Sequence, residues 1–204
     1  MKVLLLNGSP HEHGCTFTAL SEVARTLREC DVEAEILWLG NDPVQDCIGC
    51  HGCRRTGKCV FQDDIVSLIQ EKAETADGFV FGTPVYYAHP SGRVLSILDR
   101  VFFSRSSAFA HKPGASVVSA RRGGTTASFD VMNKYFTISE MPVVSSSYWN
   151  MVHGNRPEEV LQDAEGLQTM RNLGRNMAWL IKCIAAGGIP APESERGAFT
   201  SFIR

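Results

Sequence analysis

The chain has 204 residues and a mass of 22.4 kDa, the size of one domain with one sizeable hydrophobic core. Apolar residues make up 44% and charged residues 21%, with no low-complexity tract or internal repeat, which argues against a disordered, fibrous or repeat protein. The net charge is −2 and both signs are interspersed, so the sequence indicates no basic surface for nucleic acid.

The first residues, MKVLLLNGSP, predict a protein that stays in the cytoplasm. Their apolar run stops after four residues, far short of a secretion signal or of the ~20 residues that span a membrane. We therefore expect no membrane partner. Disulfides are rare in the reducing cytosol, so the seven cysteines indicate metal binding or redox chemistry in preference to disulfide bonds.

Strand-like aliphatic runs alternate with segments of helical periodicity along the chain. We expect strands at residues 2–6, 34–39, 78–83, 115–120 and 143–145, and helices at 16–29, 65–73, 91–103, 126–136 and 163–185. Five such units predict an α/β fold: a doubly wound, five-stranded parallel sheet between two helical layers. We expect one domain over residues 1–186, with an insertion at about 41–62, and a C-terminal tail at 187–204.

The loop after the first expected strand, GSPHEHGCTFT, has the features of a phosphate site. In a doubly wound sheet, ligands bind beyond the carboxyl ends of the strands. This loop offers hydroxyls, glycines and the free N–H groups of a helix start, which favour a phosphate dianion. It contains neither G-x-x-x-x-G-K-[ST] nor G-x-G-x-x-G, so ATP hydrolysis and a tightly held dinucleotide lose support. The alternative is a plain turn with a Ser or Thr helix cap.

Three motifs in order carry a resemblance to a known family. They are GSPxxxGxT after the first strand, GTPVYYAHPSGRVLSILDRV around the third and ARRGGTT after the fourth. With them, about residues 1–185 resemble the NADPH-dependent FMN reductase family of flavodoxin-like proteins. The resemblance implies that the FMN phosphate is held by Ser9, His11, Thr16 and Thr18. His11 stands where Arg or Lys is usual and Cys15 where Asn is usual, so fewer charges would hold the phosphate.

The same resemblance places the second and third loops against the flavin ring. It puts Pro84, Val85, Tyr86 and Tyr87 along the flavin, and Ala120, Arg121, Arg122, Gly123 and Gly124 over its other edge. The residues agree, because a Thr-Pro pair forces an extended exit from the strand and paired glycines allow close backbone approach. Core or subunit packing is the alternative for the two tyrosines. The two arginines either stabilise reduced flavin or are solvated.

A compact cysteine motif, CIGCHGCRRTGKC, lies between the second strand and the following helix. Its thiols belong to Cys47, Cys50, Cys53 and Cys59. Closely spaced thiolates separated by glycines favour a [4Fe–4S] cluster. Zinc fits less well, because its structural sites draw ligand pairs from separate knuckles; vacant or redox-active thiols are a further alternative. The motif, with the downstream Asp63-Asp64, resembles that of the iron–sulfur flavoproteins within this family.

Other residues have more ordinary interpretations beside the functional one. Trp149 and His153 follow the last expected strand, and we expect them to line a substrate pocket. A lone histidine is more often a structural hydrogen-bonding residue than a proton donor. We interpret Asp99 and Arg100 as a fold-stabilising pair.

Together these features predict an FMN-dependent oxidoreductase. It would accept a hydride from NAD(P)H, a transient substrate, and pass electrons to a quinone, a ferredoxin, an oxygen species or a similar acceptor, with the [4Fe–4S] cluster as a possible relay. We expect no catalytic side chain, because the cofactor carries the chemistry. The resemblance implies a homodimer or homotetramer. The alternative is a flavodoxin-like electron carrier, or FMN-binding module, without its own NAD(P)H activity; the T-x-T-G-x-T loop of classical flavodoxins is absent from the sequence.

Overall fold

A parallel sheet forms the centre of the molecule. The computed structural model describes residues 1–61, 64–200 and 202–203. The strands are β1 (Lys2–Asn7), β2 (Glu33–Trp38), β3 (Gly78–Tyr86), β4 (His89–Pro90), β5 (Gly114–Ala120) and β6 (Met151–His153). Five of these described strands are parallel, in the order β2-β1-β3-β5-β6, and β4 pairs antiparallel with β3. The predicted doubly wound sheet is confirmed, with the short β4 as an addition.

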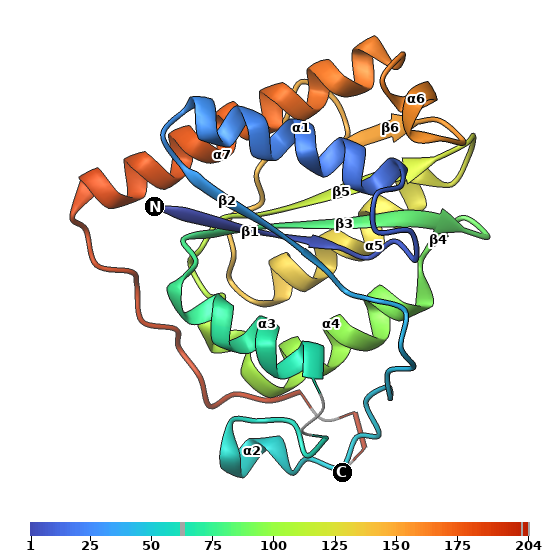
Figure 1. Ribbon diagram of the computed structural model, residues 1–204. Helices are drawn as coiled ribbons and strands as arrows, with labels where there is room; N and C mark the ends of the chain where they lie inside the picture. The colour runs from blue at the N-terminus through green and yellow to red at the C-terminus, as the bar shows by residue number, and fades with distance from the viewer. Residues whose placement is uncertain (62–63, 201, 204) are drawn as a thin grey trace.

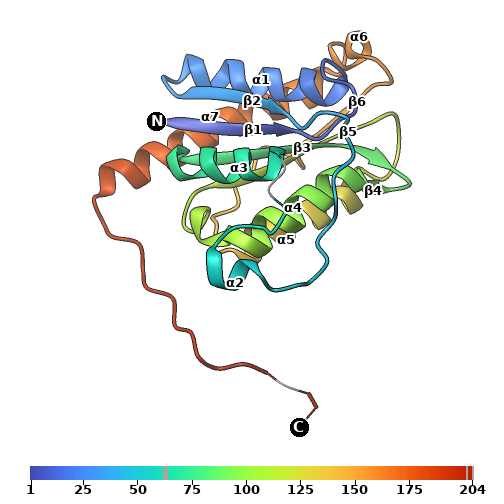
Figure 2. The same ribbon diagram turned by 60° about the horizontal axis from the view of Figure 1, so that its bottom comes forward.

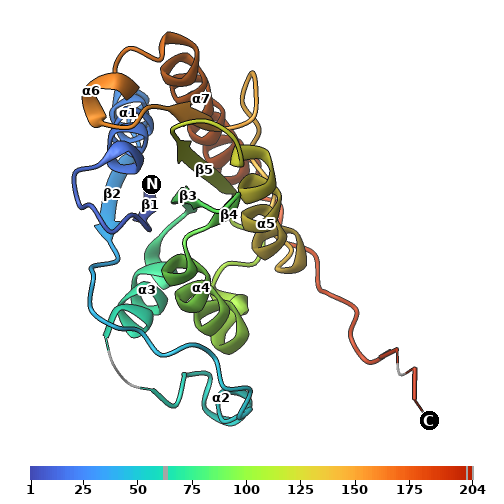
Figure 3. The same cartoon turned by 90° about the vertical axis from the view of Figure 1, so that its right-hand side faces the viewer.

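Helices cover both faces of this sheet. They are α1 (Cys15–Glu29), α2 (Cys53–Thr56), α3 (Asp64–Thr75), α4 (Gly92–Arg105), α5 (Thr125–Ile138), α6 (Pro157–Val160) and α7 (Ala164–Gly187), with a 3₁₀ turn at Ser106–Ala108. Helices α1 and α7 lie on one face, and α3, α4 and α5 lie on the other (Figures 1 and 3). The predicted three layers are therefore present.

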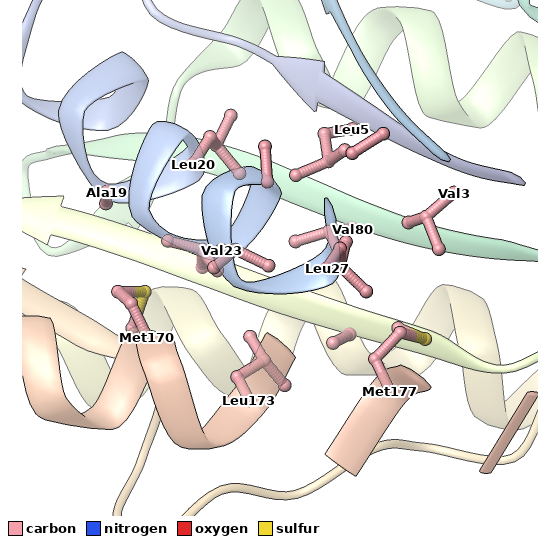
Figure 4. Close-up of a cluster of buried hydrophobic side chains, with 14 of the residues drawn as sticks. Val3, Leu5, Ala19, Leu20, Val23, Leu27, Val80, Met170, Leu173 and Met177 are labelled. Atoms are coloured by element: carbon pink, nitrogen blue, oxygen red, sulfur yellow. The ribbon is translucent and has the colours of Figure 1, made fainter. Parts of the chain in front are cut away.

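The two helical layers bury opposite sides of the same strands. In β1, Leu5 packs toward α1 and α7 (Figure 4), whereas Leu4 and Leu6 belong to the cluster on the α3 and α4 side. All three side chains are fully buried. Burying a leucine stabilises the fold by roughly 1.5–3 kcal/mol, so an aliphatic run without alternation is what a central strand requires.

The last parallel strand is not where the sequence predicts it. The expected strand at 143–145 is wrong: a single bridge joins Val143 to Gly114. The strand proper is β6, whose register pairs His153 with Ala120. The segment between the bridge and β6 leaves the edge of the sheet.

Hydrogen bonds to α7 accompany this detour, and the segment bonds β5 again where the Val118 N–H donates to the Asn150 carbonyl at 2.9 Å. The Ser146 hydroxyl donates to the Thr169 carbonyl at 2.7 Å, and the Asn176 amide donates to the Ser145 carbonyl at 2.8 Å. Short hydroxyl side chains offer the backbone an alternative to the strand ladder.

The chain after α7 continues as an extended tail. Residues 188–200 form no helix or strand, and the tail runs away from α7 (Figure 2). Ile189 and Phe199 are exposed there, and Ser194 donates to the Glu140 carboxylate. Within the described part of the chain, no helix has the length and hydropathy needed to cross a bilayer.

Candidate functional site

The loops after β1 and β3 contact each other at the carboxyl edge of the sheet. The Gly8 N–H donates to the Gly82 carbonyl at 2.9 Å, and the Ser91 hydroxyl donates to the Gly8 carbonyl at 3.0 Å. A Cβ on Gly8 would lie 2.9 Å from both the Gly82 oxygen and the Val94 Cβ. Only glycine permits this approach, so the residue fixes the loop beside the start of α4.

Side chains fold the β1 loop back on itself. The buried Asn7 side chain accepts from the Ser9 N–H at 3.2 Å, and the Ser9 hydroxyl accepts from the His11 N–H at 3.1 Å. The Trp38 indole N–H donates to the Ser9 carbonyl at 2.8 Å. These hydrogen bonds hold the loop in its folded-back shape. Asn7 and Trp38 were not predicted as site residues; their signal in the sequence is their position at the ends of β1 and β2.

Helix α1 begins directly behind this loop, with its amino end toward it. Among the described residues, no side chain caps that end at Gly14. Uncapped first-turn N–H groups and the positive end of the helix dipole favour an anion. The Thr18 hydroxyl lies in the first turn and donates to the Gly14 carbonyl at 3.2 Å, whereas Thr16 is buried and its hydroxyl shares a 2.8 Å hydrogen bond with Ser119.

Cys15 is the first residue of α1 and is half-buried. Its thiol lies 3.6 Å from the Gly154 carbonyl oxygen. Burial raises the pKa of this thiol, and the nearby carboxylates of Glu159 and Glu158 raise the pKa further. The thiol is therefore protonated near neutral pH and places no negative charge against a phosphate.

The hairpin after β3 holds two non-glycine residues in the left-handed region. Tyr87 has φ +50° and Ala88 has φ +59°, between the paired ends of β3 and β4. Such a conformation costs about 1–2 kcal/mol per residue and is often retained where a site needs a defined shape. Tyr87 is fully exposed and Tyr86 is 46% exposed, so neither ring is a core residue. Pro84 and Val85 are half-buried beneath them.

The loop after β5 packs against this hairpin. Gly124 has φ +96°, and a Cβ there would lie 2.6 Å from the Ala88 Cα. Ala120 is buried at the end of β5, whereas Arg121 and Arg122 are exposed, as is Gly123. Three predicted loops are thus brought together at one edge.

Trp149 and His153, predicted to line a substrate pocket, make different contacts. Trp149 precedes β6, is half-exposed, and contacts Tyr148 with ring centroids 4.9 Å apart. Its hollow, beside α5, does not include His153. The His153 N–H donates to the Asp163 carboxylate at 2.7 Å, and that carboxylate also caps α7.

The four cysteines of the compact motif line one small hollow beside the end of α4. Cys47 and Cys50 are exposed, and Cys53 and Cys59 are half-buried. Across residues 1–61, 64–200 and 202–203, no three Cys, His, Asp or Glu side chains are gathered closely enough for a single metal ion. A [4Fe–4S] cluster binds each thiolate through a different iron, so it takes ligands spread around a cavity. The donor set fits such a cluster. Asp63 lies outside the described residues.

Arg100, on α4, forms one wall of the same hollow. Its guanidinium donates to the Cys59 sulfur at 3.4 Å, the Gln45 carbonyl at 3.1 Å and the Phe61 carbonyl at 3.0 Å. These three acceptors do not include Asp99, the expected partner of Arg100. The Asp99 carboxylate instead accepts from the Tyr135 hydroxyl at 2.5 Å. No signal in the sequence indicates these contacts, because Gln45 and Phe61 accept through backbone carbonyls and lie 55 and 39 positions away along the chain.

The strand order and the loops meeting at the carboxyl edge define a flavodoxin-like protein. The family model of NADPH-dependent FMN reductases matches residues 1–156, and the chain belongs to this family. It is therefore an oxidoreductase of the FMN-binding, flavodoxin-like kind.

Relatives extend the match over most of the chain. An iron-sulfur flavoprotein of Methanocaldococcus jannaschii is 31% identical over 192 residues, covering 90% of this chain and 99% of that one. One of Archaeoglobus fulgidus is 30% identical over 175 residues, covering 84% and 86%. Among solved structures, a flavone reductase (TM-score 0.71, 19% identity, 91% of this chain and 64% of that one) shares the fold. So does an NAD(P)H:quinone oxidoreductase of Methanothermobacter marburgensis (TM-score 0.63, 15% identity, 87% and 96%).

Proposed function

We propose that the protein is an NAD(P)H-dependent flavoprotein oxidoreductase that binds FMN at the carboxyl edge of its sheet. The observation that carries the proposal is the contact of three loops there, between Gly8 and Ser91 and between Gly124 and the hairpin. When bound, FMN supplies the redox chemistry, accepting two electrons as a hydride from NAD(P)H and passing them to an acceptor.

The chain's own residues would bind and orient the cofactor. The amino end of α1, with Ser9, His11 and Thr18 around it, would hold the phosphate. Thr16, whose buried hydroxyl is bonded to Ser119, would contribute through its backbone N–H in the first turn. The protonated Cys15 thiol keeps repulsion low. Tyr86, Tyr87 and the segment from Ala120 to Gly124 would bound the ring. Arg121 or Arg122 would place a positive charge near the reduced ring.

We further propose that Cys47, Cys50, Cys53 and Cys59 hold a [4Fe–4S] cluster. Support comes from their position around one hollow, from the cationic wall supplied by Arg100, and from similarity to two iron-sulfur flavoproteins. With the cluster present, the flavin would convert two-electron into one-electron chemistry, and the cluster would supply one-electron transfer toward a ferredoxin, a quinone or an oxygen species.

The two proposed centres lie at opposite ends of α4. Ser91 and Val94, at its start, contact the β1 loop, whereas Arg100 and Phe103 line the cysteine hollow. From Ser91 to Phe103 the helix rises roughly 18 Å. Neither centre therefore shares ligands with the other, and each is testable separately.

The decisive experiment is an anaerobic titration of FMN-loaded protein with NADPH and with NADH. We expect the visible absorbance of the oxidised flavin to disappear on the timescale of one catalytic turnover. Added quinone should restore this absorbance. Protein that binds FMN but keeps its flavin band with both nucleotides would contradict the proposal and favour an electron carrier. Iron and acid-labile sulfide, measured on protein kept free of oxygen, test the cluster independently.

We also propose a homodimer or homotetramer. Tyr87 is fully exposed and Tyr86 half-exposed at the proposed flavin site, so one chain leaves this edge open to solvent. A neighbouring copy would cover it and exclude water from the ring.

A further inference from the structure

One buried cation on α4 is placed at the cysteine segment, residues 42–61, and not at the flavin edge. Arg100 is 1% exposed. A guanidinium stays charged at any physiological pH, and its burial is costly unless hydrogen bonds satisfy it. The hydrogen-bond acceptors of Arg100 in this segment therefore indicate its structural role.

Those acceptors come from both arms of the segment. The Gln45 carbonyl lies before the first cysteine, and the Phe61 carbonyl lies after the last one. The guanidinium also lies 5.4 Å from the centre of the Phe61 ring, within the range of a cation–π contact. The planar guanidinium therefore bridges the two ends of the segment. Residues 42–61 contain no strand, and their one helix is the four-residue α2.

Another hydrogen bond of Arg100 goes to Cys59, one of the proposed cluster ligands. The Arg100 Nε lies 3.4 Å from the Cys59 sulfur, and the side chain lines the same hollow as the four thiols. Hydrogen bonds to the sulfurs and nearby positive charge stabilise the more negative, reduced state of an iron–sulfur centre.

The same helix provides a matched comparison. Arg93 lies seven residues earlier, on nearly the same face of α4. It donates to the Leu39 and Asp42 carbonyls and so holds the entry to the segment, but it does not line the cysteine hollow. Arg93 and Arg100 thus share a chemistry and differ in contact with the thiols.

We propose that Arg100 is a positioning residue for the iron–sulfur centre: it ties both arms of the cysteine segment to α4 and sets the reduction potential through its bond to Cys59. The second part rests on the proposed cluster. The first part does not.

The first experiment uses cluster-free full-length protein and limited trypsin digestion. Trypsin sites Arg54, Arg55 and Lys58 lie inside the segment. Arg100→Met should be cut there at least about tenfold faster than the unsubstituted protein, since a lost hydrogen bond to a charged group is worth about 1.5–3 kcal/mol. Arg93→Met loosens only the entry at Asp42, outside the cysteine hollow, and should speed cutting there less than Arg100→Met does. An Arg100→Met cutting rate equal to that of the unsubstituted protein overturns the positioning role.

The second experiment reconstitutes the same proteins anaerobically with iron and sulfide and measures cluster content and midpoint potential by EPR-monitored titration. Arg100→Met should lose iron or hold a cluster of lower potential, Arg100→Lys should lie between, and FMN content should be unchanged in both. A full cluster at unaltered potential in Arg100→Met overturns the tuning role. If Arg100→Met does not unfold cooperatively, Arg100→Gln replaces it in both experiments. Failure of the unsubstituted protein to take up a cluster overturns the cluster assignment and the tuning role with it, and the digestion alone then decides the positioning role.

Discussion

At the scale of single residues, Gly124 offers the sharpest test of the loop contacts. A side chain there would meet both a φ of +96° and the Ala88 backbone at 2.6 Å. We expect Gly124→Ala to destabilise the protein by about 1–3 kcal/mol and to weaken FMN binding at least several-fold. Urea unfolding and a fluorescence titration with FMN measure the two effects. Gly123→Ala is the control, because a Cβ at Gly123 has nothing within 4 Å; equal effects of the two substitutions would refute the argument.

The strained hairpin gives a prediction with two opposite signs. Tyr87→Gly and Ala88→Gly should each stabilise the FMN-free protein by up to about 1 kcal/mol, because glycine adopts positive φ without strain. Only Tyr87→Gly should weaken FMN binding, since it alone removes a ring. Melting temperatures and FMN dissociation constants of both variants check this. Unchanged FMN affinity in Tyr87→Gly would assign the ring to another role.

At the scale of elements, an ionic contact joins α1 to α7 and should make stability depend on pH. The Glu22 carboxylate accepts from Arg25 and, at 2.8 Å, from Arg171. Its pKa is lowered, chiefly by the hydrogen bond from Arg25 and also by that from Arg171. A lowered carboxylate pKa adds stability above the unfolded-state value, about 4.3, and this stability is lost as the pH falls through the folded-state value.

We therefore expect Glu22→Gln to lose about 0.5–1 kcal/mol at neutral pH and almost nothing once the pH lies below the lowered folded-state pKa of Glu22. Urea unfolding at several pH values measures the difference. Glu29→Gln is the control, because Glu29 is more exposed and bonds only within α1 among its described contacts. A Glu22→Gln penalty that is the same at every pH would show that the charge is not responsible.

At the scale of the whole molecule, the tail after α7, of which the structure describes residues 188–200 and 202–203, adds little to the folded domain. After α7, Phe199 and Phe202 are at least 90% exposed, and Ser194 and Arg196 contact Glu140 at the surface. Deletion of residues 189–204 should leave the melting temperature within a few degrees and FMN binding intact, because residues 189–200 and 202–203 are all exposed. Scanning calorimetry and an FMN titration test this. A large loss of stability would place the tail within the fold, and the division into residues 1–186 and 187–204 stays a prediction until then.

The sequence by itself determined the sheet, the helical layers and the order of the motifs. Continuous aliphatic runs such as Val3 to Leu6 are compatible with a strand buried on both faces, and helical periodicity is a local property of the chain. The loop motifs were readable for the same reason, because glycine and proline requirements are local.

Tertiary structure alone decided the remaining features. The last strand lies at Met151–His153 and not at 143–145, because distant polar side chains on α7 bind the intervening segment. The distant loops that contact one another through Gly8 and Gly124, and the seat of Arg100 between the arms of the cysteine segment, depend on contacts between residues tens of positions apart. A pattern along the chain indicates which residues are buried and which form turns. The residues that contact one another are determined only when the helices pack on the sheet.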